Sequence, residues 1–153
     1  MKEQPQVISI RPVINYPKHA EPGRTYLLDV DIASDDAPDG WNYDREEYTV
    51  FCTVDGGTRF RVEAQGIEPK DGEVRDTASI VIHRFGGTYG PARFFVTASN
   101  EEGPGAFRVA LISGWGMPLL EVVLDDVIIE KMTVPQTTVA RVEKHTRSRI
   151  SSP

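Results

Sequence analysis

Short apolar segments with large side chains at every second position, separated by glycine-rich turns, constrain the fold of this chain most. The pattern is clearest from Ile80 to Asp125, where four such segments follow one another. A spacing of two places these side chains on one face of a β-strand, and the glycines allow the backbone to reverse. The run therefore predicts an antiparallel meander in a β-sheet core. The residues that share a face are Ile80 and Ile82; Phe94, Val96 and Ala98; Phe107, Val109 and Leu111; and Leu120, Val122 and Leu124.

The same alternation recurs before this run. It predicts a first strand from Val7, which we expect at a sheet edge because Pro12 has no amide proton to donate, and a further strand at Thr25–Ile32. Tyr48–Val54 and Phe60–Ala64 also alternate, and the Asp-Gly pair between them is a strong hairpin signal. The sequence therefore predicts a β-hairpin from these two segments.

Residues 127–132, after Asp125 and Asp126, are predicted to form a last strand, which brings the count to eight to nine strands without a helix. Short strands with turns roughly every 8–12 residues favour two packed antiparallel sheets. The expected fold class is all-β, an antiparallel two-sheet β-sandwich of the immunoglobulin-like or jelly-roll-like kind.

A chain of 153 residues suits one domain with a single core. We expect this domain to span residues 1–132. Residues 133–153 lack a sustained apolar period and carry four Lys or Arg side chains against one Glu, so they are interpreted as a flexible basic C-terminal tail. The tail has a local charge of +3, which leaves −9 on residues 1–132 because the net charge is −6.

Composition excludes several function classes. The acidic net charge is opposite to the basic excess of a general nucleic-acid binder. No apolar run approaches the roughly 20 residues of a membrane-spanning helix, and the first residues lack the apolar segment of a signal peptide. The single cysteine, Cys52, falls in an apolar alternation, which predicts a buried and unreactive thiol. We therefore expect a cytoplasmic protein with no nucleic-acid or membrane partner.

No stretch has the residues of a catalytic or cofactor site. Phe85–Arg93 is rich in glycine, but Pro91 and a strand-like segment follow where a phosphate-binding loop needs a helix. Ser113–Leu119 lacks the Gly-x-Ser-x-Gly order of a nucleophile elbow. The three histidines are far apart and show no metal-ligand spacing. The expectation is a protein that is not an enzyme and has no cofactor.

Aromatic residues are the candidates for ligand or partner binding. Trp41 and Tyr43 lie in the acidic segment Asp35–Glu47, where exposed rings would stack on a ligand or anchor a protein. Trp115 stands between two glycines, and Tyr89 lies in the glycine-rich stretch that precedes residues 92–98. For Trp115, a position that caps the core is the alternative to a binding role.

The same acidic segment also predicts a metal site. Asp35, Asp36, Asp39 and Asp44 would offer carboxylate oxygens to a calcium ion at the rim of the sandwich. An EF-hand is excluded, because Ala37 stands at the third loop position and the flanks have the pattern of strands. The alternative is a solvated acidic loop that binds no ion.

Two stretches, FGGTYGPARFFVTA and LISGWGMPL, resemble a small β-rich domain of bacterial multidomain proteins in predicted signalling or phage-conflict systems. There the domain is an accessory beside a protease, an NTPase or a repeat module. The resemblance extends over Val7 to Asp125 and implies an interaction or assembly role without catalytic residues. This chain would be free-standing, which departs from that pattern.

The leading hypothesis is a non-enzymatic protein-interaction or assembly domain, an accessory subunit in a bacterial signalling or defence complex. It would bind another protein, or a second copy of itself as a homo-oligomer, through a sandwich face or an exposed edge strand. The alternative hypothesis is a ligand- or calcium-binding β-sandwich that uses the acidic aromatic loop 35–47.

Overall fold

The computed structural model describes residues 7–34, 47–65, 76–83, 87–132, 139–143 and 148–151, which form strands and turns without a helix. Nine strands have at least five residues and two are shorter, which confirms an all-β chain of the expected strand count. Within this part of the chain there is accordingly no helix that could cross a membrane. In chain order the strands are β1 (Val7–Pro17), β2 (His19–Ala20), β3 (Thr25–Ser34), β4 (Glu47–Asp55), β5 (Phe60–Ala64), β6 (Thr77–His83), β7 (Ala92–Ala98), β8 (Gly103–Ser113), β9 (Pro118–Ile129), β10 (Val139–Glu143) and β11 (Ser148–Ser151).

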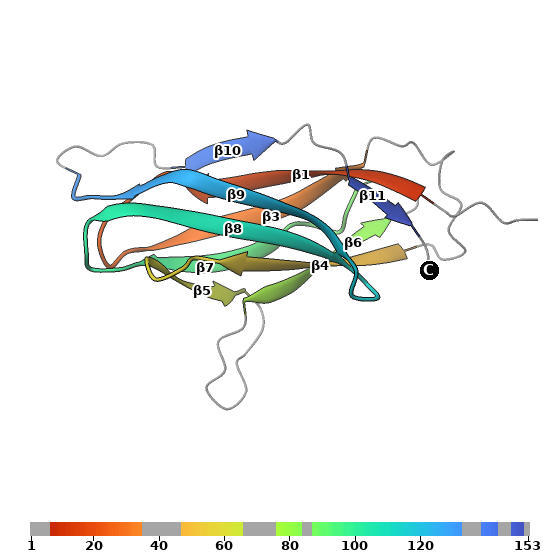
Figure 1. Cartoon of the computed structure of the whole chain (residues 1–153), viewed down its shortest axis with the longest axis horizontal. Coiled ribbons are helices and arrows are strands. Elements are labelled where there is room, and N and C mark those ends of the chain that lie inside the picture. Colours follow the sequence, from red (N-terminus) through yellow and green to blue (C-terminus); the bar gives the residue numbers. More distant parts are fainter. Residues whose placement is uncertain are drawn as a thin grey trace, which may run out of the picture.

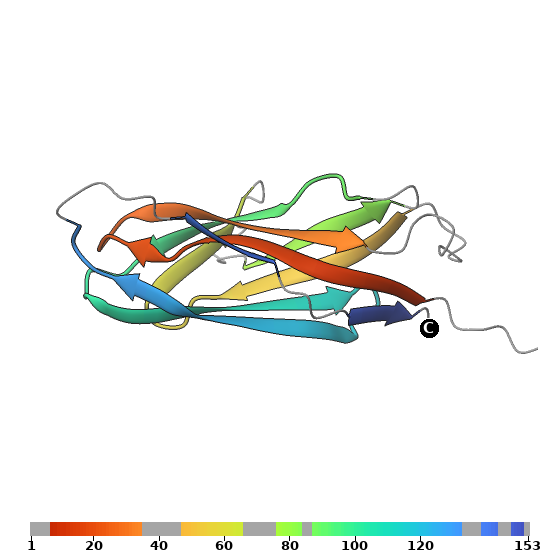
Figure 2. The same ribbon diagram turned by 90° about the horizontal axis from the view of Figure 1, so that it is seen from above.

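The strands form two sheets that run along the long axis of the molecule (Figure 1). The first sheet has the order β10-β1-β3-β7-β5, and β11 also pairs with β1. The second has the order β2-β9-β8-β4-β6. The pairings are antiparallel except the short one between β2 and β9. Seen from above, β1 in red and β9 in blue run along the same side of the molecule (Figure 2).

Both sheets bury one face in a single shared core. Phe94 and Val96 of β7, in the first sheet, and Phe107 and Val109 of β8, in the second, have no exposed surface. The ring of Phe60 from β5 lies 4.4 Å from that of Phe107, between centroids, so side chains of the two sheets meet. Each fully buried Phe or Val side chain contributes about 1.5–3 kcal/mol. The spacing-of-two pattern thus identified the inner faces of these strands correctly.

The predicted hairpin of β4 and β5 is wrong. β4 pairs with β6 and β8 in the second sheet, whereas β5 pairs with β7 in the first. The connection through Asp55, Gly56 and Gly57 is therefore an arch that crosses from one sheet to the other. An Asp-Gly pair indicates that the chain reverses, but a strand with one buried face can return to either sheet.

Gly56 makes this arch tight. Its carbonyl oxygen accepts a hydrogen bond from the N–H of Phe60 at 3.2 Å, and Asp55 Oδ1 accepts one from the N–H of Gly57 at 2.8 Å. A Cβ atom at Gly56 would lie 2.6 Å from the Cβ atom and from the carbonyl oxygen of Phe60. Gly57 has φ of +62° with open space around it, so it requires a left-handed backbone but not a missing side chain.

The predicted meander is confirmed only for β8 and β9, which pair with each other. β6 belongs to the second sheet and β7 to the first, so the chain crosses between the sheets after β6 and again after β7. The alternation of apolar residues indicates which face of a strand is buried. It does not indicate which strand lies beside it, because both sheets offer the same apolar interior.

β1 is not an edge strand, contrary to the prediction made from Pro12. β3 pairs with one edge of β1, and the C-terminal strands pair with the other: β10 with residues 13–17 and β11 with residues 7–10. The interval between β10 and β11 falls at residues 11 and 12 of β1. Pro12 has no amide proton to donate. It is tolerated because it stands at the part of this edge of β1 that has no described partner strand.

The prediction of a flexible tail is therefore wrong for residues 139–143 and 148–151, which extend the first sheet. Residues 133–138, 144–147 and 152–153 lie outside the described residues. The sequence lacked a signal for these two strands because backbone ladder bonds form between extended segments without any apolar period.

β9 runs through Asp125 and Asp126, where the sequence predicted a break before a separate last strand. These two residues lie opposite the single residue Ala106 and form a β-bulge. The extra residue shifts the alternation, so that Leu124 and Val127 are both buried although they are three positions apart. One strand therefore replaces the two that were expected.

The bulge also places a carboxylate beside a buried tyrosine. Tyr16 of β1 is only 2% exposed, and its hydroxyl donates a hydrogen bond to Asp126 Oδ1 at 2.9 Å, which links the two sheets. Burial, followed by this hydrogen bond and the charges of Asp126 and Asp125, raises the pKa of the Tyr16 hydroxyl to about 12. The neutral hydroxyl is thus the form that the fold stabilises.

We expect Gly56→Ala to lower the free energy of unfolding by about 2 kcal/mol, because the added methyl group meets the backbone of Phe60. Gly57→Asn is the matched control. Asparagine tolerates a positive φ and the space around Gly57 is open, so this change should cost less than about 1 kcal/mol. Urea unfolding followed by circular dichroism measures both, and an unchanged stability of Gly56→Ala would contradict the tight arch.

Tyr16 should make the fold sensitive to alkali. Its hydroxyl titrates at 10.0 in the unfolded chain and at about 12 in the fold, so the stabilisation is complete below pH 10 and is lost as the pH rises to 12. The loss amounts to about 3 kcal/mol. In Tyr16→Phe this part of the pH dependence should vanish, at a cost of about 1 kcal/mol at neutral pH for the lost hydrogen bond. Urea unfolding between pH 8 and 12 compares the two proteins, and parallel pH profiles would refute the assignment.

Candidate functional site

The structure describes two of the predicted binding residues, Tyr89 and Trp115. The aromatic and calcium predictions in the acidic loop stay predictions, because their residues are not described. Outside the described residues lie Trp41, Tyr43, Asp35, Asp36, Asp39 and Asp44.

Trp115 occupies a core-capping position, which was the alternative to a binding role. It is partly buried against the core, and its ring meets that of Tyr48 edge-on with centroids 5.2 Å apart. Tyr48 is itself only 3% exposed. The indole therefore closes one end of the core, and a binding role for it stays a prediction.

Tyr89 is the most exposed large hydrophobic residue of the described chain, at 65%. Its hydroxyl donates to Glu47 Oε1 at 2.9 Å, and its ring meets His83 edge-on at 5.5 Å between centroids. Tyr89 and Trp115 thus both reach the beginning of β4, but through Glu47 and Tyr48, which point to opposite faces of the strand. The fold does not combine the two rings into one surface.

The described residues include no group of three or more His, Cys, Asp or Glu side chains that could hold a metal ion. Cys52 is fully buried, as predicted, and burial raises the pKa of its thiol to about 12. A protonated thiol without access to solvent is not a nucleophile at neutral pH.

The feature of the described chain that is best suited to binding is the edge of β5 on which no described strand lies. The N–H of Ser99 bonds to the C=O of Arg59, and the N–H of Gln65 bonds to the C=O of Arg93, so odd-numbered residues of this segment face β7. Backbone groups alternate sides along an antiparallel strand. The N–H and C=O of Val62 therefore point away from β7, to a side on which no described strand lies.

β6 forms the corresponding edge of the second sheet, but its end is partly covered. The N–H of His83 bonds to the C=O of Gly87, and the C=O of Val81 accepts the N–H of Tyr89. An added strand would have to displace the segment from Gly87 to Tyr89. β5 is therefore the more accessible of these two edges in the described chain.

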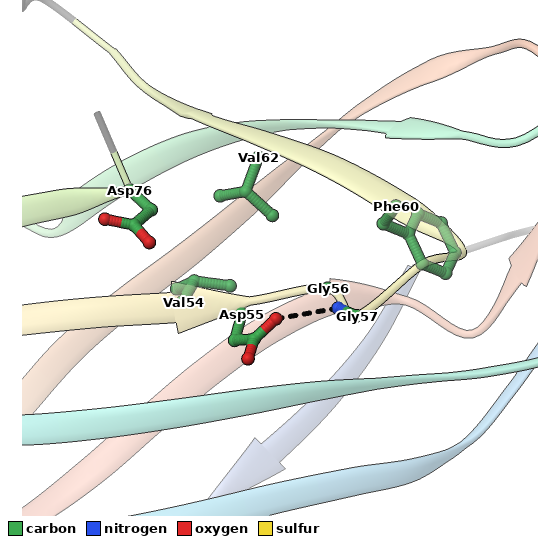
Figure 3. Close-up of a pocket in the computed structure, with 7 residues that line it drawn as sticks. All are labelled: Val54, Asp55, Gly56, Gly57, Phe60, Val62 and Asp76. Atoms are coloured by element: carbon green, nitrogen blue, oxygen red, sulfur yellow. Dashed lines mark hydrogen bonds between the residues drawn. The ribbon is translucent and has the colours of Figure 1, made fainter. Parts of the chain in front are cut away.

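A cavity of about 210 Å³ adjoins the β5 edge. Figure 3 shows Phe60 and Val62 of β5 on one side of it, Val54 and Asp55 of β4 on the other, and Asp76 just before β6. The three apolar side chains are at most 6% exposed. The cavity is open to solvent and lies at the side where the first sheet ends.

Two carboxylates form the polar rim of this cavity. Asp55 is held by the N–H of Gly57, and Asp76 Oδ1 accepts a hydrogen bond from the Thr77 hydroxyl at 3.2 Å. Both side chains are exposed, and neither has an ion-pair partner among the described residues. Asp55 lies on the exposed face of β4, where Arg108 of β8 is its cross-strand neighbour, whereas Asp76 lies opposite the buried Val54.

The opposite face of β5 is basic. Arg59 and Arg61 line a second hollow of about 590 Å³ on the outer surface of the first sheet, together with Thr97 and Ser99. Each arginine is within ion-pair distance of a carboxylate: Arg59 Nη1 lies 3.5 Å from Glu101 Oε2, and Arg61 Nη2 lies 3.1 Å from a Glu63 oxygen. The charges of Arg59 and Arg61 are therefore already paired with carboxylates.

The β5 site was missed by sequence reasoning because its residues looked like half of a hairpin. Phe60–Ala64 alternates like an ordinary strand, and nothing in its composition marks a sheet edge. β5 has five residues, fewer than β3, which also borders β7, and fewer than β6 and β8, which border β4. This short length was the only available signal of the site in the sequence.

Comparisons with protein-family models, with curated proteins and with solved structures gave no match. The family resemblance of FGGTYGPARFFVTA and LISGWGMPL therefore stays a prediction.

Because Cys52 is buried, its thiol should be unreactive in the native protein, and chemical labelling tests this directly. A chromogenic disulfide reagent should label the native protein no faster than the protein unfolds, because the thiol is fully buried and its pKa is about 12. Adding urea to the unfolding midpoint should accelerate labelling by orders of magnitude. Stoichiometric labelling of the native protein within seconds would contradict the burial.

Proposed function

We propose that this chain is a non-enzymatic protein-interaction domain that binds an extended segment of another protein as an additional strand at the edge of β5. One observation carries the proposal: the outward backbone groups of Val62 lie at a sheet edge with no described neighbour, beside an open cavity that Phe60 and Val62 line. Strand addition uses these two features together, since backbone hydrogen bonds supply affinity and a side-chain pocket supplies specificity.

Several other edges are partly covered. The outer edge of β1 is occupied by β10 and β11, and β6 is bonded near its end to Gly87 and Tyr89. β2 covers only Ile128 and Ile129 of β9, and β10 ends the first sheet on the other side, so the adjoining cavity is what favours β5 over these edges. A five-residue edge admits a short segment and is too small for indiscriminate sheet extension. Recognition by β5 is thereby limited to segments whose side chains fit the cavity.

We assign the two sheets to the β-sandwich class, of immunoglobulin-like or jelly-roll-like kind. Support comes from the shared core and from chain crossings between sheets after β4, β6 and β7. By the resemblance described above, the domain is an accessory subunit of a bacterial signalling or defence complex. Its single free cysteine suits the reducing cytoplasm.

The proposal is tested by selecting peptides on the protein itself. A displayed library of random peptides should yield binders whose affinity depends on β5. Ala64→Pro removes an outward N–H and places a ring in the path of the added strand, while the hydrogen bonds to β7 remain. It should weaken binding by about tenfold or more, as measured by fluorescence anisotropy.

The matched control is Ala64→Ser, which keeps the N–H and should bind within about twofold of wild type. Circular dichroism and thermal melting must show that both variants fold. Amide chemical shifts of Val62 and Ala64 should move when the peptide binds. If no peptide is enriched, or if the enriched peptides bind Ala64→Pro as well as wild type, strand addition at β5 is refuted.

A further inference from the structure

The outward backbone groups of β5 are complementary to those of a second β5. Odd-numbered residues bond to β7, so the even-numbered residues Phe60, Val62 and Ala64 point their N–H and C=O groups outward. The N–H of Phe60 is already bonded to the C=O of Gly56 in the arch. In an antiparallel pair centred on Val62, the two Val62 residues exchange both hydrogen bonds, and the N–H of Ala64 donates to the C=O of Phe60 in the other copy. Each outward donor that the arch leaves unbonded thus meets an acceptor.

The same register brings opposite charges together on the outer face. Arg61 and Glu63 flank Val62, so Arg61 of each copy lies opposite Glu63 of the other. Within one chain Arg61 Nη2 already lies 3.1 Å from Glu63 Oε1, and the two side chains are 68% and 45% exposed. Pairing two copies alternates the four charges around a ring and leaves the pair within each chain intact. Opposite charges in directly opposed positions stabilise an antiparallel pair of strands, whereas like charges destabilise it.

Side-chain sizes are complementary on the inner face. There Phe60, the largest inner side chain of β5, lies opposite Ala64, the smallest, and Val62 lies opposite its own counterpart. These three side chains are at most 6% exposed and belong to the core, so an added copy continues an existing apolar face. The segment Phe-Arg-Val-Glu-Ala therefore matches itself in backbone bonding, charge and size when two copies run in opposite directions.

We propose that the strand added at β5 is β5 of a second copy of this chain, paired antiparallel about a two-fold axis at Val62. The first sheets of the two copies then join into one continuous sheet. Because the contact is the same on both copies, it occupies both edges and association ends at a dimer. This inference rests on the proposed strand addition and names the partner at that edge.

Reversing the two charges tests the register. Sedimentation of the full chain from about 1 µM to about 1 mM should show a monomer–dimer equilibrium, in the range expected of a small interface. Arg61→Glu sets carboxylates opposite each other in the dimer, and Glu63→Arg sets guanidinium groups opposite each other. Each variant alone should associate about tenfold more weakly than wild type.

An equimolar mixture of the two variants should associate within about threefold of wild type, because every opposed pair is again opposite in sign. Recovery in the mixture also requires that both variants are folded. Arg108→Glu is the matched control. Arg108 is an exposed arginine of the second sheet, paired with Glu121 at 3.3 Å, so this variant makes the same charge change away from β5 and should associate as wild type does.

Two further measurements place the contact on β5. Ala64→Pro, which removes the N–H that donates to Phe60 of the other copy, should reduce association by about tenfold or more. Hydrogen exchange at the amides of Val62 and Ala64 should slow as the protein concentration rises. Exchange at Arg61 and Glu63 should not change, because these residues bond to β7 in the monomer.

The possible failures separate this inference from the proposed function. A chain that stays monomeric at about 1 mM, or a mixture of the variants that does not regain association, overturns pairing of two β5 strands in this register. Strand addition still stands in that case if selected peptides bind and Ala64→Pro prevents their binding. Self-association that Ala64→Pro leaves unchanged also overturns the inference, because the contact then lies elsewhere on the molecule.

Discussion

Burial of one apolar face from each of two sheets in a common core is the constraint on which the rest of this fold depends. Side chains such as Phe60 and Phe107 come from different sheets and fill the same space, so neither sheet is stable without the other. The chain satisfies this constraint by crossing repeatedly between the sheets. Gly56 shows what such a crossing requires, because only a residue without Cβ lets the arch approach Phe60 so closely.

Two open sheets facing each other must each end in an edge, and the two sides of this molecule treat that problem differently. On one side, β10 and β11 cover the edge of β1, and the Tyr16 hydroxyl joins the sheets through Asp126. On the other side, β5 ends the first sheet beside an open cavity, and no described strand lies beyond it.

Alternation predicted the buried faces of β7 and β8, and the burial of Cys52, because a period of two is a local property of a strand. Pairing was predicted poorly. Pro12 suggested an edge, but two separate strands flank it and leave an interval at its position. Asp125 and Asp126 suggested a chain break, but a β-bulge absorbs the extra residue within β9. The binding residues proposed from sequence were aromatics in the acidic loop and in glycine-rich stretches, whereas the cavity at β5 is lined in part by residues with the pattern of ordinary core.

The sequence by itself determined that the chain is all-β and which side chains face inward, because apolar spacing and glycine turns act over a few neighbouring residues. Only the tertiary structure decided that β4 and β5 belong to different sheets, that residues 139–143 and 148–151 contribute strands, and that Val54 of β4 and Val62 of β5 line one cavity. These are contacts between segments distant along the chain. They depend on which of several equally apolar surfaces each strand packs against, and no local pattern of residues encodes that choice.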